Sequence, residues 1–280
     1  MFGATGQVAQ EVLRRAGDDE VTALARAAAD LSDPEACAGL IEEAEADAVL
    51  NAAAWTAVDD AEAKEAEARV ANAAAPGAMA RAAAARGLPF IHISTDYVFD
   101  GAGERPWAEG DAVAPLGAYG RTKLEGEREV AAAGGPHAVL RTSWVFSSHG
   151  KNFVKTMLRV GAERDRLTVV DDQIGGPTPA AAIADACLSI ARAFRAGRGV
   201  SGIYHFGGAP WVSWRGFAEA IFAEAGMKVE VAPILTADWP TPARRPLNSR
   251  LDCRKIAADY GIGAPDWRAG LAEVVKELTT

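Results

Sequence analysis

The sequence predicts an α/β protein with a doubly wound, Rossmann-like parallel sheet and a smaller C-terminal substrate-binding domain. Short apolar runs alternate with alanine-rich, charge-decorated stretches of helical length, which is the order that parallel β–α–β units require. The runs are apolar on both faces and do not alternate with polar residues, which indicates strands covered by helices on both sides.

The elements follow in order along the chain. We expect strands at 21–25, 48–54, 89–94 and 138–142, with further candidates at 167–170 and 203–206. We expect helices at 7–16, 34–45, 59–86 and 118–132, the third of them broken at Pro76-Gly77. Only Met1 and Phe2 precede the first glycine, so the first strand is either very short or already under way where the sequence begins.

The composition changes at about residue 145, where Trp, Pro and Gly become more frequent. We therefore expect residues 1–145 to form a dinucleotide-binding domain. Residues 146–280 are expected to form mainly a substrate-binding domain, with the chain crossing back to the first domain.

Charge and composition exclude several classes of protein. Half of the chain (49%) is hydrophobic, which excludes intrinsic disorder, and 29 Lys and Arg against 38 Asp and Glu give a net charge of −9. Because this charge repels phosphate backbones and anionic bilayers, we predict no nucleic-acid and no membrane partner. Three scattered cysteines, no signal peptide and no apolar run of about 20 residues predict a cytoplasmic protein without a structural zinc site.

A glycine-rich turn opens the first predicted helix, in the sequence Gly3-Ala4-Thr5-Gly6-Gln7-Val8-Ala9. Free backbone amides and the positive end of a helix dipole suit a pyrophosphate. A glycine turn before any helix looks similar, so the turn alone is weak. We include Gly3, Thr5, Gly6, Gln7 and Val8 among the cofactor-binding residues.

The second predicted strand ends at Leu24-Ala25-Arg26, with no carboxylate for an adenosine ribose. An arginine there accepts a 2′-phosphate, which favours NADPH over NADH, although Arg26 as a solvated surface charge is the alternative. Asp30 can hydrogen-bond the adenine amino group. Ser32 and Asp33 are expected to cap the next helix.

Polar and small side chains follow the next two predicted strands. Asn51-Ala52-Ala53-Ala54 leaves room for a flat cofactor, and Thr95 and Asp96 follow the strand after it. Because ligands bind outside the carboxyl ends of parallel strands, Thr95 and Asp96 are placed for substrate contact, with loop capping as the alternative.

Tyr119 and Lys123 lie four residues apart in the predicted helix 118–132 and so share one face. A phenol has an ordinary pKa near ~10, and a neighbouring ammonium favours its ionised form. The pair therefore predicts an acid tuned for proton transfer. The rival P-loop, G-x-S-x-G and H-E-x-x-H motifs are missing, and His92, His137, His149 and His205 are expected to be structural.

These motifs together resemble the extended short-chain dehydrogenase/reductases, and most closely their dTDP-4-dehydrorhamnose reductase family. Further matches run from end to end of the chain: Gly6-Gln7-Val8, Trp55-Thr56-Ala57-Val58-Asp59, Arg141-Thr142-Ser143-Trp144-Val145, Asn152-Phe153, Asp172-Gln173-x-Gly175-x-Pro177-Thr178 and Arg245-Pro246-x-Asn248-Ser249-x-Leu251.

The resemblance implies an oxidoreductase that reduces the C4 ketone of dTDP-4-dehydro-L-rhamnose to dTDP-L-rhamnose with NADPH, or with NADH. It implies that Tyr119 protonates the nascent alkoxide, that Lys123 lowers the Tyr119 pKa and holds the ribose, and that Thr95 hydrogen-bonds the reacting oxygen. The substrate contacts we assign are Thr95, Asp96, Tyr97 and Trp144. The resemblance further implies that Gln7, Val8, Asp30, Leu31, Ala53, Ala54 and Trp55 line the dinucleotide.

The sequence departs from the family pattern at two positions. Some members hold magnesium at a dimer interface through glutamates; Glu11 matches one, but Ala181 follows Thr178-Pro179-Ala180, so we expect no metal-bridged dimer. Trp55 stands where other members often have a different side chain. A monomer or a homodimer is expected.

Three competing functions share this fold. A nucleotide-sugar 4,6-dehydratase would need a carboxylate base where Tyr97 stands, so we expect reduction and not dehydration. A non-catalytic NADP-binding regulatory subunit would have no need of the Tyr119, Lys123 and Thr95 set. A reductase of a different dTDP-4-keto-6-deoxy sugar would use the same set.

Overall fold

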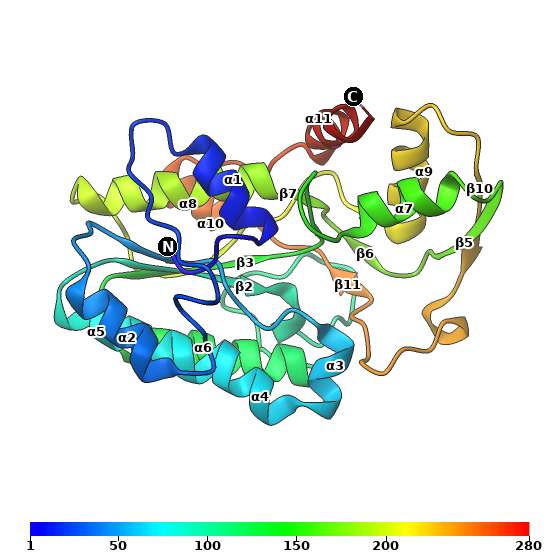
Figure 1. Ribbon diagram of the computed structural model, residues 1–280. Coiled ribbons are helices and arrows are strands. Elements are labelled where there is room, and N and C mark those ends of the chain that lie inside the picture. The colour runs from blue at the N-terminus through cyan, green and yellow to red at the C-terminus, as the bar shows by residue number, and fades with distance from the viewer. Residues whose placement is uncertain (280) are drawn as a thin grey trace.

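The computed structural model describes residues 1–279 and confirms the predicted α/β class, with one parallel sheet covered by helices on both faces (Figure 1). The helices are α1 (Gln7–Arg15), α2 (Pro34–Glu43), α3 (Val58–Ala63), α4 (Glu65–Arg69), α5 (Ala75–Ala85), α6 (Ala118–Ala132), α7 (Phe153–Gly161), α8 (Ala180–Arg195), α9 (Trp214–Glu224), α10 (Arg254–Tyr260) and α11 (Trp267–Thr279), with the shorter turns η1 (Val70–Ala74), η2 (Asp96–Val98) and η3 (Thr236–Asp238). The strands are β1 (Val49–Asn51), β2 (Phe90–Thr95), β3 (His137–Thr142), β4 (Val145–Phe146), β5 (Arg166–Val170), β6 (Ile174–Gly175), β7 (Thr178–Pro179), β8 (Gly202–His205), β9 (Val212–Ser213), β10 (Glu230–Ile234) and β11 (Asn248–Ser249).

The main sheet has the order β1-β2-β3-β8, with every pair parallel. Phe2 extends it beyond β1 by single parallel bridges to Asn51 on one side and to Leu24 on the other. Phe2 therefore lies between Leu24 and β1 in the sheet. The chain passes from Phe2 to Leu24 on one side and then crosses to β1 on the other side. Ligands of open parallel sheets bind at such a reversal, and the glycine turn follows Phe2 directly.

The second predicted strand, 21–25, is wrong in extent. Only Leu24 pairs, through a bond from its N–H to the Met1 carbonyl and a bond from the Gly3 N–H to the Leu24 carbonyl. Its one neighbour in the sheet is the short segment before Gly3, and a strand cannot pair beyond the length of its partner.

The predicted break at Pro76-Gly77 is also wrong. The helical run is interrupted at Lys64, between α3 and α4, and again by the π-helical turn η1. Pro76 instead lies in the first turn of α5, where a missing N–H costs little. Asn72, fully buried in η1, donates to the Thr122 hydroxyl and to the Trp55 carbonyl, which fixes this irregular turn against α6.

The helices divide between the two faces of the sheet (Figure 1). On one face α2 packs against α5, and α5 packs against α6; on the other α1 packs against α8. After β7 the chain returns to the main sheet: α8 covers one of its faces and β8 is its last strand. The division at residue 145 stays a prediction.

The remaining elements form a second apolar cluster beside the sheet, built on α7, α9, α11, β5 and β10. Phe217 and Trp267 lie at its centre, with ring centroids 5.4 Å apart and edge to face. None of the helices within residues 1–279 combines the length and the apolar character needed to cross a membrane.

Candidate active site

The glycine turn lies against the end of β1. Gly3 has a φ of +96°, and a Cβ at this residue would lie 3.3 Å from the Ala52 carbonyl carbon, so both conformation and space favour glycine. Gly6 caps α1 without any side-chain bond, and the first turn of α1 holds no acidic residue. The first amides of α1 therefore remain available, and the turn fits a pyrophosphate.

The side chain of Gln7 joins this turn to the loop after β4. Its Oε1 accepts from Ser147 Oγ and from Asn152 Nδ2, both at 2.9 Å. Val8 faces the core and is 8% exposed, whereas Thr5 is exposed and its carbonyl accepts from Gln10 Nε2. Of the predicted cofactor residues in this turn, Val8 thus contributes mainly packing and Gln7 mainly a hydrogen-bonded link.

Arg26 and Asp30 lie together on the surface beyond the Leu24 bridge. Arg26 Nε is 3.3 Å from Asp30 Oδ2, and 85% of the arginine side chain is exposed. The Ser32 backbone N–H, followed by the Arg26 guanidinium, lowers the pKa of Asp30. Leu31 packs partly on the core. Asp33 accepts from the Ala36 N–H as the N-cap of α2, which confirms one of the two predicted caps.

Two asparagine side chains fix the backbone of the small residues that follow β1. Asn51 Oδ1 accepts from the Ala53 N–H at 3.1 Å, and Asn72 Oδ1 accepts from the Trp55 N–H at 2.9 Å. Trp55 is half-buried, and its indole N–H donates to the Ala57 carbonyl. Ala53 and Ala54, both partly accessible, form the strand end between these anchors.

The predicted catalytic side chains come together where β2 ends and α6 begins. Thr95 Oγ1 donates to Asp96 Oδ1 and accepts from the Tyr97 N–H, both at 3.2 Å. The rings of Tyr97 and Tyr119 meet edge to face with centroids 5.4 Å apart. Helix α6 approaches this closely because Gly120 has no side chain: a Cβ there would collide with the Tyr97 carbonyl oxygen.

Burial sets the protonation of this group. It raises the pKa of Asp96 to about 6, with the Ser249 and Thr95 hydroxyls partly offsetting the rise. It also raises the pKa of Tyr119 to about 12, which the Thr95 hydrogen bond partly offsets and the Asp96 charge increases. The expected lowering of the Tyr119 pKa by Lys123 is therefore corrected: the phenol is held as a protonated donor.

Lys123 is buried one helical turn beyond Tyr119, but its amine points to the sheet. Lys123 Nζ lies 3.1 Å from His92 Nε2 and donates to the Ile93 carbonyl at 2.7 Å. Burial lowers the pKa of Lys123 to about 8, against a smaller opposing effect of Glu127. His92 in turn contacts Asn51, at 3.1 Å between Nδ1 and Nδ2.

A second buried polar group lies on the same helix. Arg141 donates to both carboxylate oxygens of Glu127, at 2.9 and 2.6 Å, and Ser94 donates to the same carboxylate. His205 lies on the other side of the guanidinium, at 3.4 Å. This group, which we call the Arg141 cluster (Arg141, Glu127, Ser94 and His205), ties α6 to β2, β3 and β8.

Sequence reasoning missed several residues that the fold brings to this site. Arg245, from the loop before β11, donates to Asp59 Oδ2 at 2.7 Å, and its charge lowers the pKa of Tyr97 against the larger effect of burial. Four buried side-chain atoms have no hydrogen-bond partner among residues 1–279: Asp96 Oδ2, Thr142 Oγ1, Arg245 Nη1 and, beside Glu11, His149 Nε2. Unpaired buried polar atoms that point to one region are typical of a ligand site. Arg245 and Ser249 both belong to the motif Arg245-Pro246-x-Asn248-Ser249-x-Leu251. The spacing of this motif does not indicate what either residue does.

Trp144 lies beside these residues with an unusual backbone, at a φ of +48°. Its ring stacks on Trp214, with centroids 3.7 Å apart, and covers Gly175, which pairs with Ser249. A bulky residue held at positive φ is uncommon and concentrates at functional sites. This placement brings Trp144 to the same end of the site as Asp96.

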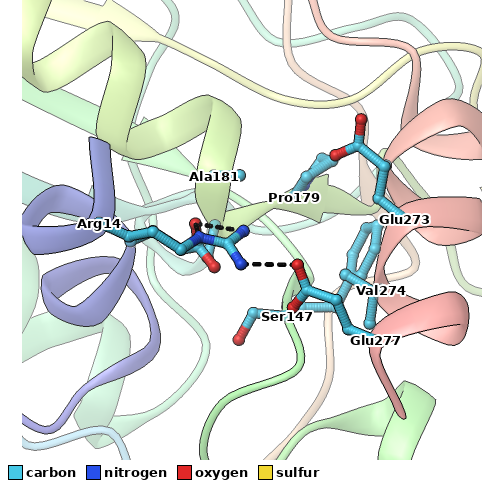
Figure 2. Close-up of a pocket in the computed structure, with 11 residues that line it drawn as sticks. Arg14, Ser147, Pro179, Ala181, Glu273, Val274 and Glu277 are labelled. Atoms are coloured by element: carbon cyan, nitrogen blue, oxygen red, sulfur yellow. Dashed lines mark hydrogen bonds and ion pairs between the residues drawn. The ribbon is translucent and has the colours of Figure 1, made fainter. Parts of the chain in front are cut away.

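The possible magnesium ligand, Glu11, lies elsewhere, in a small pocket between α1 and α11. Arg14 is 2.9 Å from Glu11 and 2.6 Å from Glu277, and Ala181 lies on the wall of the same pocket (Figure 2). The arginine thus supplies the positive charge between these carboxylates. Within residues 1–279 the structure shows no group of three or more metal-ligating side chains.

Comparisons with known proteins agree over the full length. The family model described as RmlD substrate binding domain matches residues 1–280. A dTDP-4-dehydrorhamnose reductase of Burkholderia thailandensis is 45% identical, over 99% of this chain and 97% of that protein.

Solved structures give the same result. The crystal structure of a dTDP-4-dehydrorhamnose reductase from Clostridium acetobutylicum has a TM-score of 0.94 and 35% identity, covering 100% of this chain and 98% of the other. A dTDP-4-dehydrorhamnose reductase from Bacillus anthracis in complex with NADP has a TM-score of 0.93 and 31% identity, covering 99% and 97%.

Proposed function

The chain belongs to the dTDP-4-dehydrorhamnose reductase family and is an oxidoreductase, and we propose that it reduces the C4 ketone of dTDP-4-dehydro-L-rhamnose to dTDP-L-rhamnose with NADPH. The observation that carries the proposal is the meeting of Thr95, Asp96 and Tyr119 where β2 ends and α6 begins, in a chain this similar to named reductases. We propose that NADH can replace NADPH, with weaker binding.

The cofactor extends from the glycine turn across the end of β1. Gly3, Thr5, Gly6, Gln7 and Val8 form the turn that takes its pyrophosphate, because the first amides of α1 have no side-chain partner. When bound, the dinucleotide supplies the hydride that C4 accepts. Arg26, Asp30 and Leu31 lie at the adenosine end, and Ala53, Ala54 and Trp55 at the nicotinamide end.

Tyr119 supplies the proton. Its raised pKa keeps the hydroxyl protonated at neutral pH, so it can donate to the oxygen of C4 as negative charge develops there. Thr95 hydrogen-bonds the reacting oxygen beside Tyr119, which holds the acceptor close to the proton donor. Lys123, one turn along α6, holds the ribose of the dinucleotide in its ammonium form.

The sugar nucleotide lies against Thr95, Asp96, Tyr97 and Trp144. Asp96 has a free buried oxygen to accept from a sugar hydroxyl, and its raised pKa means that it ionises near pH 6. Trp144 offers an aromatic face that its stacking on Trp214 holds in place.

The direct test is turnover of dTDP-4-dehydro-L-rhamnose, followed by the loss of NADPH absorbance and identification of the product. Tyr119→Phe is expected to bind NADPH normally and to lose kcat by about 10²-fold or more, as general-acid catalysis requires. Tyr260→Phe is the matched control, because its hydroxyl bonds the Val200 carbonyl away from the site. Unchanged turnover in Tyr119→Phe refutes the proton donor, and no NADPH oxidation with this sugar refutes the substrate.

A further inference from the structure

His92 is fully buried in β2 and touches a proposed catalytic residue. Its Nε2 lies 3.1 Å from Lys123 Nζ, and its Nδ1 lies 3.1 Å from Asn51 Nδ2. The imidazole thus joins the helix that carries Tyr119 to the strand that ends beside the glycine turn. Each of its two nitrogens has one partner, so the position of its proton follows from those partners.

Asn51 fixes the order of hydrogen bonding. The Ala53 N–H can only donate, and Asn51 Oδ1 accepts from it at 3.1 Å. The amide group of Asn51 therefore faces His92 with its nitrogen, which can only donate. His92 Nδ1 must be the acceptor. A neutral imidazole then carries its single proton on Nε2.

The proton on Nε2 determines the state of Lys123. An ammonium has three donors and no acceptor, so it cannot accept from His92 Nε2–H; the neutral amine can. That amine still donates one N–H to the Ile93 carbonyl, at 2.7 Å. The buried setting agrees, because burial lowers the pKa of both Lys123 and His92, and the Lys123 charge lowers that of His92 further.

The other charged groups near Lys123 do not reverse this order. Glu127, on α6, raises the Lys123 pKa slightly, but Arg141 and Ser94 occupy its carboxylate. Tyr119 lies one turn earlier on α6, and Asp96 follows β2; both belong to the Thr95 group described above. Within residues 1–279, no carboxylate forms an ion pair with Lys123.

We propose that His92 is a positioning residue: through the fixed order Asn51 to His92 to Lys123, it stabilises the neutral amine of Lys123 and so lets this lysine change charge near neutral pH. The inference rests on the proposed function, in which the ammonium form of Lys123 holds the ribose of the dinucleotide.

The tautomer of His92 can be read directly by nitrogen NMR of the full chain with ¹⁵N-labelled histidine. Above about pH 8, where Lys123 is neutral, we expect His92 as the Nε2–H form. His205 is an internal reference for the opposite form, since its Nδ1 faces the Trp107 carbonyl, which only accepts, and its Nε2 faces Arg141, which only donates. A proton on Nδ1 of His92 above about pH 8 overturns the proposal.

The variant Asn51→Asp is expected to reverse the order of donors and acceptors from residue 51 through His92 to Lys123, and the new side chain has almost the same shape as asparagine. Both carboxylate oxygens accept, one from the Ala53 N–H and the other from His92 Nδ1–H. His92 Nε2 then becomes the acceptor of a Lys123 ammonium. We expect the His92 tautomer to switch while His205 stays unchanged, and the Lys123 titration, followed by ¹³C-labelled lysine, to move up by about one pH unit or more.

The pH profile of kcat gives a second measurement. Activity should fall as pH rises past the Lys123 pKa, near 8 in the natural chain, and the fall should move to higher pH in Asn51→Asp. His92→Gln, whose amide oxygen can accept from an ammonium, should move the Lys123 titration the same way. An unmoved titration in the folded variants contradicts the proposal.

These results separate this inference from the proposed function. The tautomer and the lysine titration are measured without turnover, so they stand even if Tyr119→Phe keeps its activity. Conversely, Tyr119→Phe can lose turnover as expected while His92 shows the wrong tautomer, which would leave the reductase assignment intact and remove the role of His92.

Discussion

Two buried cations between α6 and the sheet differ in what surrounds them. Arg141 is 2% exposed and has a carboxylate that accepts two of its N–H groups, with the Phe99 ring 5.1 Å from the guanidinium carbon. Lys123 is 1% exposed, and its hydrogen-bond partners among residues 1–279 are an imidazole nitrogen and a carbonyl oxygen. The two cations are equally buried, but the Arg141 charge is compensated by a carboxylate and the Lys123 charge is not.

The difference separates structure from chemistry. A guanidinium with two charge-assisted hydrogen bonds is a fixed link, and through Glu127 it holds α6 against the sheet. Lys123 has no carboxylate as a hydrogen-bond partner, and burial lowers its pKa to about 8 because burial outweighs the opposing charge of Glu127. The Arg141 cluster therefore holds in place the helix on which Tyr119 and Lys123 lie.

The largest expected effect comes from breaking the compensated pair. Glu127→Gln leaves the Arg141 charge buried without its carboxylate, which should lower the free energy of unfolding by about 3–5 kcal/mol, measured by urea denaturation. Glu125→Gln is the control on the same helix, because its ion pair with Arg69 is half-exposed (49% and 45%) and should contribute about 1 kcal/mol or less. Equal losses in the two variants would contradict the comparison.

Removing the uncompensated cation should have a smaller, pH-dependent effect. Below about pH 8, Lys123 is protonated in both folded and unfolded chains, so its burial penalty is fully present. Between about pH 8 and 10.5 only the unfolded chain keeps the proton, so the natural chain gains stability as pH rises.

Lys123→Met lacks this gain. The difference in unfolding free energy between the natural chain and Lys123→Met should therefore shift in favour of the natural chain by about 3 kcal/mol over that window. Equilibrium urea unfolding at several pH values measures it. A difference that stays flat with pH would show that Lys123 keeps its ordinary titration when buried.

Much of the fold could be predicted from the sequence because its signals are local. Helix α6 has the predicted bounds 118–132, and β2 and β3 differ from prediction by a residue or so, since apolar runs and helical spacing act over short distances. The errors arose where a distant contact decides. The π-helical turn depends on Asn72 meeting Thr122, and the 21–25 segment is limited by its partner Phe2.

The same distinction holds for the site. Tyr119, Lys123 and Thr95 could be found because two of them share a helix face and the third ends a strand. His92 could be expected only as a structural histidine, because its partners, Asn51 and Lys123, come from two other segments and meet it only in the fold. Sequence spacing carries no signal for such a contact.

Removing an exposed cation should have the smallest effect on stability, which extends the comparison of buried cations to the surface. Arg26 is 85% exposed and pairs only with Asp30, so Arg26→Ala should leave the urea midpoint unchanged. If its guanidinium binds the 2′-phosphate, the same variant should raise KM for NADPH by about tenfold and leave KM for NADH as it was. Arg81→Ala, another exposed arginine with a surface partner, Glu129, should alter neither value. Equal changes for the two cofactors would show that Arg26 does not distinguish them, because only a group that contacts the extra phosphate can change one KM without the other.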